Sequence, residues 1–417
     1  MKYSALKGVQ DILPPDIYIW QKIEKVARDI FHFYGFQEIR LPIIESTDVF
    51  IRSIGETTDI VEKEMYTFFD KAGRSITMRP EGTAPAVRCY VEHHLYNLPS
   101  PQKFYYFGPM FRYERPQRGR FRQFYQIGVE AFGVSQTLLD VEIILMLRNL
   151  LEGVGLKEVN FELNSIGCQK CRPVYKNSLL KFFENKISDF CPDCQRRYNT
   201  NPLRILDCKV ERCVEARQGS PVVIDYLCEE CKTHFDELIF RLNALKVTYK
   251  LNPSLVRGLD YYTRTTFEVT SEHLGAQKAV AAGGRYDNLV EEFGGPKTPA
   301  IGFAIGMERV TALLKEIWAD KYPLPRVFIA TLGKEAEIEG LQIAESIREA
   351  GFWVEPNYNG EASLKSQLRK ADRMGAEIVF IIGENELMSG RVQWKNLMNG
   401  EHGEVDKKDI LRFLGYK

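Results

Sequence analysis

Apolar residues recur at helical spacing near the start of the chain. From Asp16 onward they fall three or four positions apart, at Ile19, Ile23, Val26, Ile30 and Tyr34. This spacing places them on one face of a helix, and Gly35 is a residue type that commonly follows a helix end. Residues 36–45 read as a strand, although Pro42 removes one ladder hydrogen bond. The pattern therefore predicts a helix from Asp16 to Gly35 and then a strand near an edge or interface.

A strand pair joined by an arginine-rich loop is predicted next. An aromatic run enters the loop at Arg112, and the alternating segment 124–130 leaves it. The loop region holds five arginines and one carboxylate, at Arg112, Arg115, Arg118, Arg120, Arg122 and Glu114. In the second strand a period of two places Gln126, Gly128 and Glu130 on one face. Because arginine binds phosphate oxygens in a bidentate manner, we interpret this polar face as a small-molecule pocket beside a nucleotide site. A solvated basic hairpin would explain only the arginines.

Other elements predict an antiparallel sheet with helices outside it, an α+β arrangement. A short strand covers residues 75–79, and a helix begins near Thr83 after the turn RPEGT. A further helix over 135–152 has Ser135 as its expected N-cap. Its apolar positions include Leu138, Val141 and Leu145.

The C-terminal quarter has a different pattern. After the proline-rich linker 321–325, strands and helices alternate over 326–333, 335–350, 352–356, 363–374, 377–383 and 392–397. This alternation predicts a separate α/β domain of about ninety residues. On its second helix Lys365, Arg369 and Arg373 recur at i, i+4 and i+8, a basic stripe suited to phosphate contact. A solvated face explains the stripe nearly as well.

Charge balance narrows the possible partners. With 56 basic and 56 acidic residues, the chain is not generally polybasic, so nucleic acid would have to be held by local patches. No apolar run approaches the ~20 residues that span a membrane, and the N-terminus lacks the apolar stretch of a signal peptide. We therefore expect a cytoplasmic protein without a membrane partner.

Eight of the nine cysteines form four close pairs in one window. The pairs are Cys168/Cys171, Cys191/Cys194, Cys208/Cys213 and Cys228/Cys231. Two thiolates on a tight turn reach one metal ion, so this spacing in an intracellular chain predicts tetrahedral zinc. Two four-cysteine sites are possible, or one site and a degenerate one; the alternative is a set of reduced thiols. His234 is a candidate substitute ligand, and Cys89 stands apart as a packed small hydrophobe.

The cysteine window is expected to be an inserted subdomain. It interrupts the sheet, which the pattern predicts to resume over 255–271 and to close over 301–310. In the first of these segments Arg257 precedes Tyr261 and Tyr262. These two tyrosines are expected on opposite faces of a strand, so that at least one lines a pocket.

Three short segments carry candidate ligand-binding groups. Glu81 and Thr83 are suited to an ammonium group, although Thr83 would serve equally as a helix cap. The pair Gly283 and Gly284 permits close backbone approach to a ligand, or forms a simple turn. Arg309 lies in the first turn of a predicted helix, where backbone N–H groups and the guanidinium together favour an anion.

These groups match the needs of one reaction. Joining a carboxylate to the α-phosphate of ATP requires cations placed where charge develops, with little covalent work by the protein. Arg112 and Arg309 would clamp phosphates, Phe124 would stack on adenine, and Arg257 would add a cation at the α-phosphate. Mg²⁺ would neutralise the remaining triphosphate charge. No G-x4-G-K-[ST] loop occurs, so ATP would not be held by a P-loop.

The chain resembles the bacterial histidyl-tRNA synthetases, which are class II aminoacyl-tRNA ligases, nearly from end to end. FGPMFRYERPQRGRFRQF resembles class motif 2, AIGFAIGMERV resembles motif 3, and residues 35–45 resemble motif 1. RGLDYYT and AAGGRYDNL resemble the two histidine-specific signatures, which are more specific than the class motifs. The C-terminal segment resembles an anticodon-binding domain. The cysteine cluster departs from many relatives, and we infer that metal there would staple the insertion and take no part in catalysis.

The resemblance implies a role for each matched residue. Arg112, Arg257 and Arg309 would be catalytic cations at the phosphates. The ATP-binding residues would be Arg112, Glu114, Arg120, Phe124 and Arg309. The histidine-binding residues would be Glu81, Thr83, Gln126, Glu130, Tyr261 and Tyr262. Within these sets, Glu130 and Tyr262 would read the imidazole ring, whose nitrogens can each donate or accept.

The resemblance also implies partners and domain limits. The chain would attach L-histidine to the 3′ end of tRNA(His) through a histidyl-adenylate, with ATP as substrate, Mg²⁺ and structural Zn²⁺, as a homodimer. The motif 2 loop (113–123) would contact the acceptor end of the tRNA. The catalytic domain would cover 1–165 and 246–322, with a cysteine-rich insertion over 166–245 and an anticodon-binding domain over 326–417.

Two other functions deserve comparison. A paralogue without charging activity, which regulates histidine biosynthesis, typically lacks the C-terminal domain and departs from RGLDYYT, whereas this chain has both. A zinc-dependent RNA-binding module would explain the cysteines but would give Glu81, Glu130 and Tyr262 no role. Histidine-dependent pyrophosphate exchange distinguishes the three.

Overall fold

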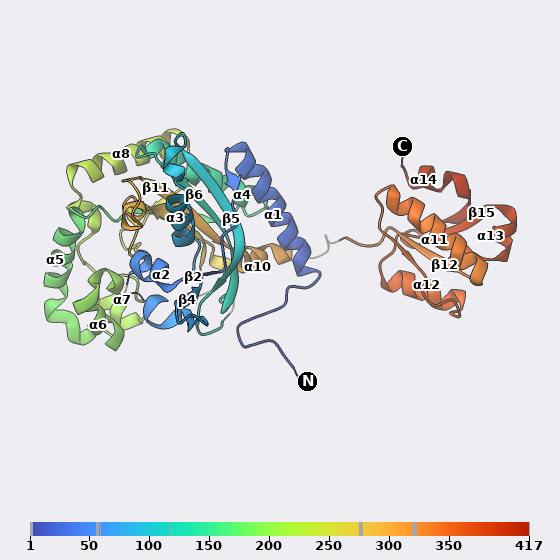
Figure 1. The fold of residues 1–417 in the computed structure, drawn as a ribbon, viewed down its shortest axis with the longest axis horizontal. Helices are drawn as coiled ribbons and strands as arrows, with labels where there is room; N and C mark the ends of the chain where they lie inside the picture. Colours follow the sequence, from blue (N-terminus) through green and yellow to red (C-terminus); the bar gives the residue numbers. More distant parts are fainter. Residues whose placement is uncertain are drawn as a thin grey trace. The chain divides into compact units, whose positions relative to one another are not determined.

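The structure is a computed structural model that describes residues 3–55, 58, 60–117, 119–274, 278–318 and 323–416. Its chain divides into two units, residues 1–319 and 320–417, which are described separately below (Figure 1). Arg118 of the arginine-rich loop and the first two residues of the predicted linker 321–325 lie outside the described residues.

A large sheet organises the first unit. In the described part of this unit, its strands follow the order β1-β5-β6-β11-β10-β9-β7-β8 and run antiparallel, except for the outer pairs β1–β5 and β7–β8. The strands are β1 (Gln37–Glu38), β5 (Gln102–Phe111), β6 (Gln123–Phe132), β7 (Asn160–Ser165), β8 (Lys250–Leu251), β9 (Thr263–Thr270), β10 (Ala279–Arg285) and β11 (Ala300–Gly306). The predicted α+β class with an antiparallel sheet is confirmed.

The helices that cover one face of this sheet include α1 (Asp16–Phe33), α4 (Thr137–Gly153) and α10 (Met307–Trp318). Their apolar faces join Ile127 and Val129 of β6 in a single core. Because side chains alternate along a strand, the intervening Gln126, Gly128 and Glu130 face the other side. In Figure 1 the sheet separates α1 from α3 (Thr83–Glu92).

The predicted strand over 36–45 is wrong as a single element. It is split into β1, in the large sheet, and β2 (Ile44–Ser46), which pairs with β4 (Ser75–Met78) in a small sheet completed by β3 (Tyr66–Phe69). Pro42 lies in the break, since it cannot donate to a ladder. The remaining elements around this sheet are α2 (Thr47–Ile54), the π-helix Ile60–Glu64, α9 (Leu289–Glu292) and the 3₁₀ turns Leu95–Asn97 and Glu272–Leu274.

Two other predicted elements differ in detail from the structure. Helix α4 begins at Thr137, with Gln136 at its N-cap position and no side-chain cap, so Ser135 does not cap it. Leu138 is 66% exposed, whereas Leu139 and the predicted Val141 are buried. The strand expected over 255–271 begins only at Thr263. The residues before it form a loop.

The cysteine-rich segment lies between β7 and β8 in the chain and has its own small core. Its helices are α5 (Cys171–Phe183), α6 (Pro192–Thr200), α7 (Glu211–Ala216) and α8 (Glu229–Ala244), with 3₁₀ turns at Glu184–Asp189, Pro202–Ile205 and Val223–Tyr226. Its core combines aromatic and aliphatic residues with buried thiols, among them Tyr175, Phe183, Phe190, Cys194 and Cys213.

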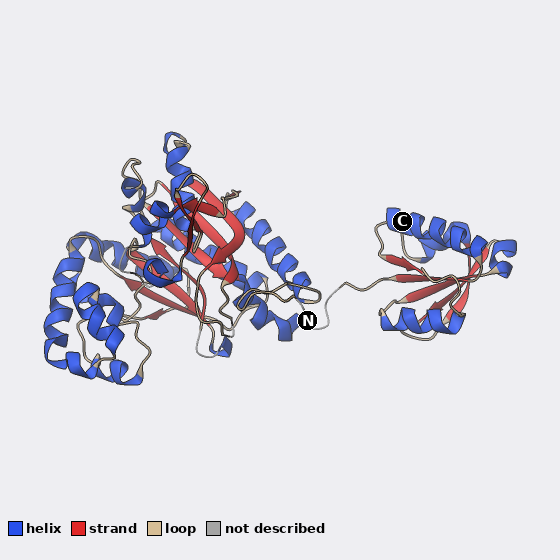
Figure 2. Cartoon of the chain, turned by 60° about the horizontal axis from the view of Figure 1, so that its bottom comes forward, coloured by secondary structure: helices blue, strands red, loops and turns tan. Residues whose placement is uncertain are grey.

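The second unit is an α/β domain, as predicted. Its sheet has the order β13-β12-β14-β15-β16, and Figure 2 shows the strands between layers of helix. The elements are β12 (Val327–Thr331), α11 (Lys334–Glu349), β13 (Val354–Pro356), α12 (Leu364–Arg373), β14 (Ile378–Ile382), α13 (Glu384–Ser389), β15 (Arg391–Asn396), β16 (His402–Asp406), the 3₁₀ turn Lys407–Asp409 and α14 (Ile410–Phe413). The sequence pattern missed β16 because this edge strand lacks buried side chains. Among the described helices of the chain, none has the length and apolar character needed to cross a bilayer.

Candidate active site

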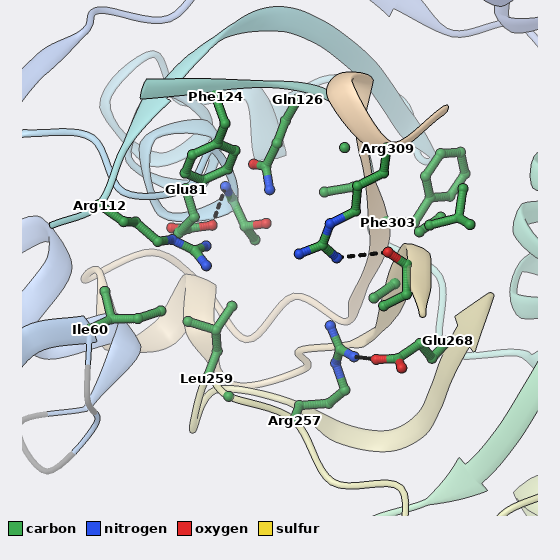
Figure 3. Close-up of a pocket in the computed structure, with 18 of the residues that line it drawn as sticks. Ile60, Glu81, Arg112, Phe124, Gln126, Arg257, Leu259, Glu268, Phe303 and Arg309 are labelled. Carbon is green, nitrogen blue, oxygen red and sulfur yellow. Dashed lines mark hydrogen bonds and ion pairs between the residues drawn. The ribbon is translucent and has the colours of Figure 1, made fainter. Parts of the chain in front are cut away.

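A cavity of about 730 Å³ opens on the face of the large sheet that α1, α4 and α10 leave free. Strands β5, β6, β9, β10 and β11 contribute to its wall, together with the first turn of α10 and the loops before α3 and β9. Figure 3 shows arginine side chains that enter this space from different sides. Segments far apart in the sequence therefore meet at one cavity.

The three arginines assigned to the phosphates all line this cavity. Arg112 follows β5 and donates through Nε to the carbonyl of Pro80 at 2.8 Å. Arg309 donates through Nη1 to the carbonyl of Ala279 at 2.7 Å. Arg257 lies in the loop before β9, with Nη1 2.8 Å from a carboxylate oxygen of Glu268. Burial lowers the pKa of Arg309, and the neighbouring positive charges of Arg120 and Arg112 lower it further. Such a concentration of partly buried positive charge favours an anionic ligand.

The arginine-rich loop is only partly directed at the cavity. Arg120 and its ion-pair partner Glu114 line the wall. Phe124 also lines it, with the Arg112 guanidinium 5.2 Å from its ring centre. Arg122 instead lies over the ring of Tyr113, 3.9 Å from its centre, and Arg115 is exposed. The loop therefore adds Arg120 to the cluster formed by the three partly buried arginines.

Glu81 caps the helix that follows it. Its carboxylate accepts from the backbone N–H groups of Thr83 at 2.6 Å and Ala84 at 2.8 Å. These bonds satisfy donors that a helix N-terminus leaves unpaired. The cap suggested for Thr83 is thus made by Glu81, while the Thr83 hydroxyl donates to Glu130 Oε1 at 2.8 Å. Burial raises the pKa of Glu81, although both backbone bonds oppose the shift.

Glu130 lies behind the cavity wall. It is 1% exposed and does not line the cavity itself. Its carboxylate accepts hydrogen bonds from three hydroxyl groups, those of Thr83, Tyr106 and Tyr286, and these three residues do line the cavity. Burial raises the pKa of Glu130 to about 8. The carboxyl group therefore organises a hydroxyl-rich wall.

Two glycines make room for this arrangement. Gly128 of β6 lies opposite Tyr106 of β5, and a Cβ at Gly128 would lie 2.0 Å from the tyrosine ring. A Cβ at Gly302 of β11 would lie 2.1 Å from Glu130 Oε2. Both positions therefore require glycine because a methyl group would displace the buried network.

The tyrosine pair does not behave as predicted. Tyr261 and Tyr262 both line the cavity, with ring centres 4.8 Å apart, because they belong to a turn and not to a strand. Gln126 lines the cavity, as the alternation of β6 predicts. Gly283 and Gly284 are absent from the lining; a Cβ at either would meet a neighbouring strand at 2.3 or 2.5 Å. These two glycines therefore allow neighbouring strands of the sheet to pack closely.

Among the wall residues that sequence reasoning missed are Tyr106, Tyr286, Glu268 and Glu308. Tyr106 could have been found from the period of β5, which places it on the same face as the polar side of β6. Tyr286 follows the AAGGR segment, but its approach to Glu130 depends on long-range register. Glu268 is the partner of Arg257. Glu308 accepts from the Tyr125 N–H at 2.9 Å, and burial raises its pKa to about 7.

The buried Glu130 predicts a pH-dependent stability. Its pKa rises from 4.5 to about 8 on folding, so the folded chain holds a proton that the unfolded chain releases between these values. The contribution of this group to the free energy of unfolding is therefore complete below pH about 4.5. It falls by about 1.4 kcal/mol per pH unit up to pH about 8. In Glu130→Gln this contribution to the slope should vanish. Unfolding of both proteins across this range checks the prediction; parallel pH profiles would contradict it.

The cysteines form two separate groups of four thiols. One contains Cys168, Cys171, Cys228 and Cys231, and the other contains Cys191, Cys194, Cys208 and Cys213. The Sγ atom of Cys168 lies 3.7 Å from that of Cys171 and 3.9 Å from that of Cys228, and Cys191 and Cys208 are 3.9 Å apart. A ZnS₄ tetrahedron with Zn–S of about 2.3 Å has edges of about 3.8 Å, far longer than a disulfide bond. The donor set and its spacing fit zinc.

His234 does not replace a cysteine in either described group. Its Nε2 atom instead lies 4.0 Å from Asp140 Oδ1, and the side chain is buried. Burial lowers the pKa of His234 to about 4. This histidine is therefore a neutral packing residue of α8.

Comparison with known proteins identifies the family. The family model described as "Histidyl-tRNA synthetase" matches residues 8–170 and 209–310, and that described as "Anticodon binding domain" matches residues 326–415. The stretch between the first two matched segments contains Cys171, Cys191, Cys194 and Cys208. A family model thus matches each of the two units of the chain.

Similar proteins of known name extend over the full chain. The histidine–tRNA ligase of Thermodesulfovibrio yellowstonii is 53% identical, covering 100% of this chain and 99% of that protein. That of Trichlorobacter lovleyi is 50% identical, covering 97% and 96%. The apo S. aureus histidyl-tRNA synthetase structure matches with a TM-score of 0.82 at 37% identity, covering 99% of each chain. A Bacillus halodurans structure titled as an ATP phosphoribosyltransferase regulatory subunit/histidyl-tRNA synthetase matches at 20% identity and TM-score 0.66, covering 92% and 99%, which shows the shared fold alone. The chain therefore belongs to the histidyl-tRNA synthetase family.

Proposed function

We propose that this chain attaches L-histidine to the 3′ end of tRNA(His), using ATP and passing through a histidyl-adenylate. The observation that carries the proposal is the convergence of Arg112, Arg257 and Arg309 on one cavity, next to a wall of hydroxyl groups. Such a cavity offers cations for a triphosphate and polar groups for a small amino acid. Full-length similarity to histidine–tRNA ligases supports the choice of amino acid.

In the first step, a carboxylate oxygen of histidine attacks the α-phosphorus of ATP, and pyrophosphate leaves. Arg112 and Arg257 would stabilise the charge that develops on the α-phosphate, and Arg309 would hold the γ-phosphate. Phe124 would stack on adenine, beside Arg120 and Glu114. Preorganised cations of this kind need little rearrangement during the reaction, because carbonyl groups and Glu268 already fix their positions.

Recognition of histidine would use the hydroxyl-rich wall next to these arginines. Glu81, Thr83 and Gln126 would bind the ammonium and carboxylate ends, and Tyr261 and Tyr262 would flank the ring. Since Glu130 does not line the cavity, we infer that it reads the imidazole through the hydroxyl groups that it orients, and not by direct contact. A site built on such bonds rejects amino acids that cannot complete them.

In the second step, the terminal ribose hydroxyl of the tRNA attacks the carbonyl carbon of the adenylate, and AMP leaves. The motif 2 loop would contact the acceptor end, and the 326–417 domain would bind the anticodon. Lys365, Arg369 and Arg373 are exposed on α12 and form the basic stripe predicted from the sequence.

Removing this stripe should weaken tRNA binding selectively. The triple variant Lys365→Ala/Arg369→Ala/Arg373→Ala should raise the KM for tRNA about tenfold or more, because phosphate contacts are lost. Histidine-dependent pyrophosphate exchange, which needs no tRNA, is the internal control and should remain unchanged. An unaltered KM for tRNA would exclude the stripe from the interface.

Two metals belong to the proposal. Mg²⁺ would lower the charge of the bound triphosphate, and the lining carboxylate of Glu308 is an oxygen donor of the type it prefers. Zn²⁺ would bind in the two four-thiol groups, where it would cross-link the helices of the insertion. Elemental analysis of the purified chain should give about two zinc ions per chain, and none would refute the second assignment.

We also infer a homodimer in the cytoplasm, with domain limits at 1–165, 166–245, 246–322 and 326–417. Exposed apolar residues Ile43, Ile44, Phe68 and Phe69 gather on β2, β3 and the segment before β2, and contact with a second copy would cover them. Sedimentation should give twice the 48.1 kDa mass of one chain. The mass of a single chain at micromolar concentration would contradict the dimer.

Histidine-dependent ATP–pyrophosphate exchange tests the proposed function. We expect exchange with histidine and with no other amino acid, followed by charging of tRNA(His). Complete absence of exchange would favour the regulatory paralogue, which lacks charging activity.

A further inference from the structure

The second four-thiol group adjoins the catalytic cavity. Cys208, one of its members, is buried, whereas its neighbours Asp207 and Lys209 are exposed and line the cavity. The backbone therefore directs alternate side chains in opposite directions. Cys208 points into the thiol group, and the two charged side chains point to the site where the proposed phosphates bind.

Several contacts fix this short segment. Cys191 and Cys208 have their Sγ atoms 3.9 Å apart, and the Cys191 N–H donates to Cys213 Sγ at 3.1 Å. Arg217 donates to the carbonyl groups of Cys208 at 2.9 Å, Ile205 at 3.3 Å and also Leu206. A metal ion bound by the four thiols would also hold this segment in place, through Cys208.

The same segment also holds the loop that carries Arg257. Arg204 donates through Nη1 to the Arg257 carbonyl at 3.0 Å. Asn201 donates to Asp260 Oδ1 at 3.2 Å. The insertion therefore contacts the loop that carries Arg257 through Asn201 and Arg204. Asp207 and Lys209 of the same segment line the cavity.

The charges of the segment suit a phosphate-binding rim. Burial lowers the pKa of Arg120, and the negative charges of Glu64 and, to a smaller degree, Asp207 oppose this fall. Lys209 brings another cation to the cavity that Arg112 and Arg309 also line. A phosphate group bound among these arginines would attract the ammonium of Lys209.

We propose that metal in the Cys191–Cys194–Cys208–Cys213 group positions Lys209 to bind a phosphate group of ATP or of the tRNA acceptor end, and holds Asp207 at the cavity wall. This inference rests on the proposed function. Cys208 is a positioning residue, because it acts through its neighbours. The metal site thus supports the substrate-binding wall through the residues on either side of Cys208, in addition to its structural role in the insertion.

The thiol group of Cys168, Cys171, Cys228 and Cys231 serves as the comparison for this proposal. It contacts the catalytic loop through Arg172, whose Nη1 lies 3.2 Å from the Asp260 carbonyl. Neither its cysteines nor the residues next to them line the cavity in the described part of the chain. Lys170, which lies beside Cys171, is exposed and serves as the control for Lys209.

The decisive experiment compares Lys209→Ala, Asp207→Asn and Lys170→Ala in the zinc-loaded full chain. Zinc content and melting temperature should be equal in all three. Lys209→Ala should raise one KM by about fivefold. A higher KM for ATP in pyrophosphate exchange would identify ATP as the source of the phosphate group, and a higher KM for tRNA in aminoacylation would identify the tRNA. Lys209→Arg should restore the original KM. Asp207→Asn should give a smaller change in the same KM, and Lys170→Ala should give none.

Cysteine variants test the link to the metal. Cys208→Ser and Cys231→Ser should each lose one zinc, but only Cys208→Ser should reproduce the KM change of Lys209→Ala. Equal KM changes in the two cysteine variants, or zinc-loaded Lys209→Ala with all KM values unchanged, would overturn the inference. If wild-type protein shows no histidine-dependent exchange, the proposed function itself fails, which is a distinguishable result.

Discussion

Arg257→Ala should reduce the rate of histidine-dependent pyrophosphate exchange by about 10²–10³-fold. The guanidinium lines the cavity and is held by Glu268, so its removal deletes a preorganised cation at the reacting phosphate. The fold should survive because Glu268 is partly exposed and tolerates the loss of its partner. Exchange kinetics and thermal melting measure the two effects separately.

Glu268→Gln is the matched control for this prediction. It removes the ion pair while Arg257 remains. If Arg257 acts on the phosphate, Glu268→Gln should lose far less activity than Arg257→Ala. Equal losses in the two variants would mean that the arginine serves only the ion pair, and full activity in Arg257→Ala would remove it from the mechanism.

Glu130→Ala should raise the KM for histidine by about 100-fold. The change leaves the hydroxyl groups of Thr83, Tyr106 and Tyr286 without their shared acceptor, so the wall that faces the imidazole loses its order. The KM for ATP should change little, because in the described part of the chain Glu130 accepts from hydroxyl groups and from none of the cavity arginines. Exchange assays with each substrate varied in turn measure both constants.

Glu130→Gln distinguishes orientation from simple space filling. It keeps the size of the side chain and one acceptor oxygen, so its effect on the histidine KM should be intermediate. A normal histidine KM in Glu130→Ala would refute the assignment of Glu130 to substrate recognition. An equal rise in both KM values would indicate general damage to the cavity.

Local sequence patterns predicted the parts of the site that lie on one element. The period of β6 placed Gln126 and Glu130 on one face, and the residue type and position of Arg309 predicted an anion-binding helix start. Resemblance to a family then joined Arg112, Arg257 and Arg309, which no periodicity could connect. The structure brings these three to one cavity.

Contacts that depend on long-range register were not predictable in the same way. Tyr106 and Tyr286 come from different hairpins, and only the assembled sheet brings both to Glu130. The opposite-face prediction for Tyr261 and Tyr262 was wrong because it assumed a strand where the chain turns. Spacing identified the cysteine pairs but not their partners, since the grouping depends on how α5 to α8 fold back on one another.

The most direct measurement is a crystal structure of the chain with a non-hydrolysable histidyl-adenylate analogue. We expect the group that replaces the α-phosphate to contact Arg112 and Arg257, the adenine to lie against Phe124, and the imidazole to meet the tyrosine wall in front of Glu130. An analogue bound outside this cavity, or bound there with the imidazole among the arginines, would contradict the proposed mechanism.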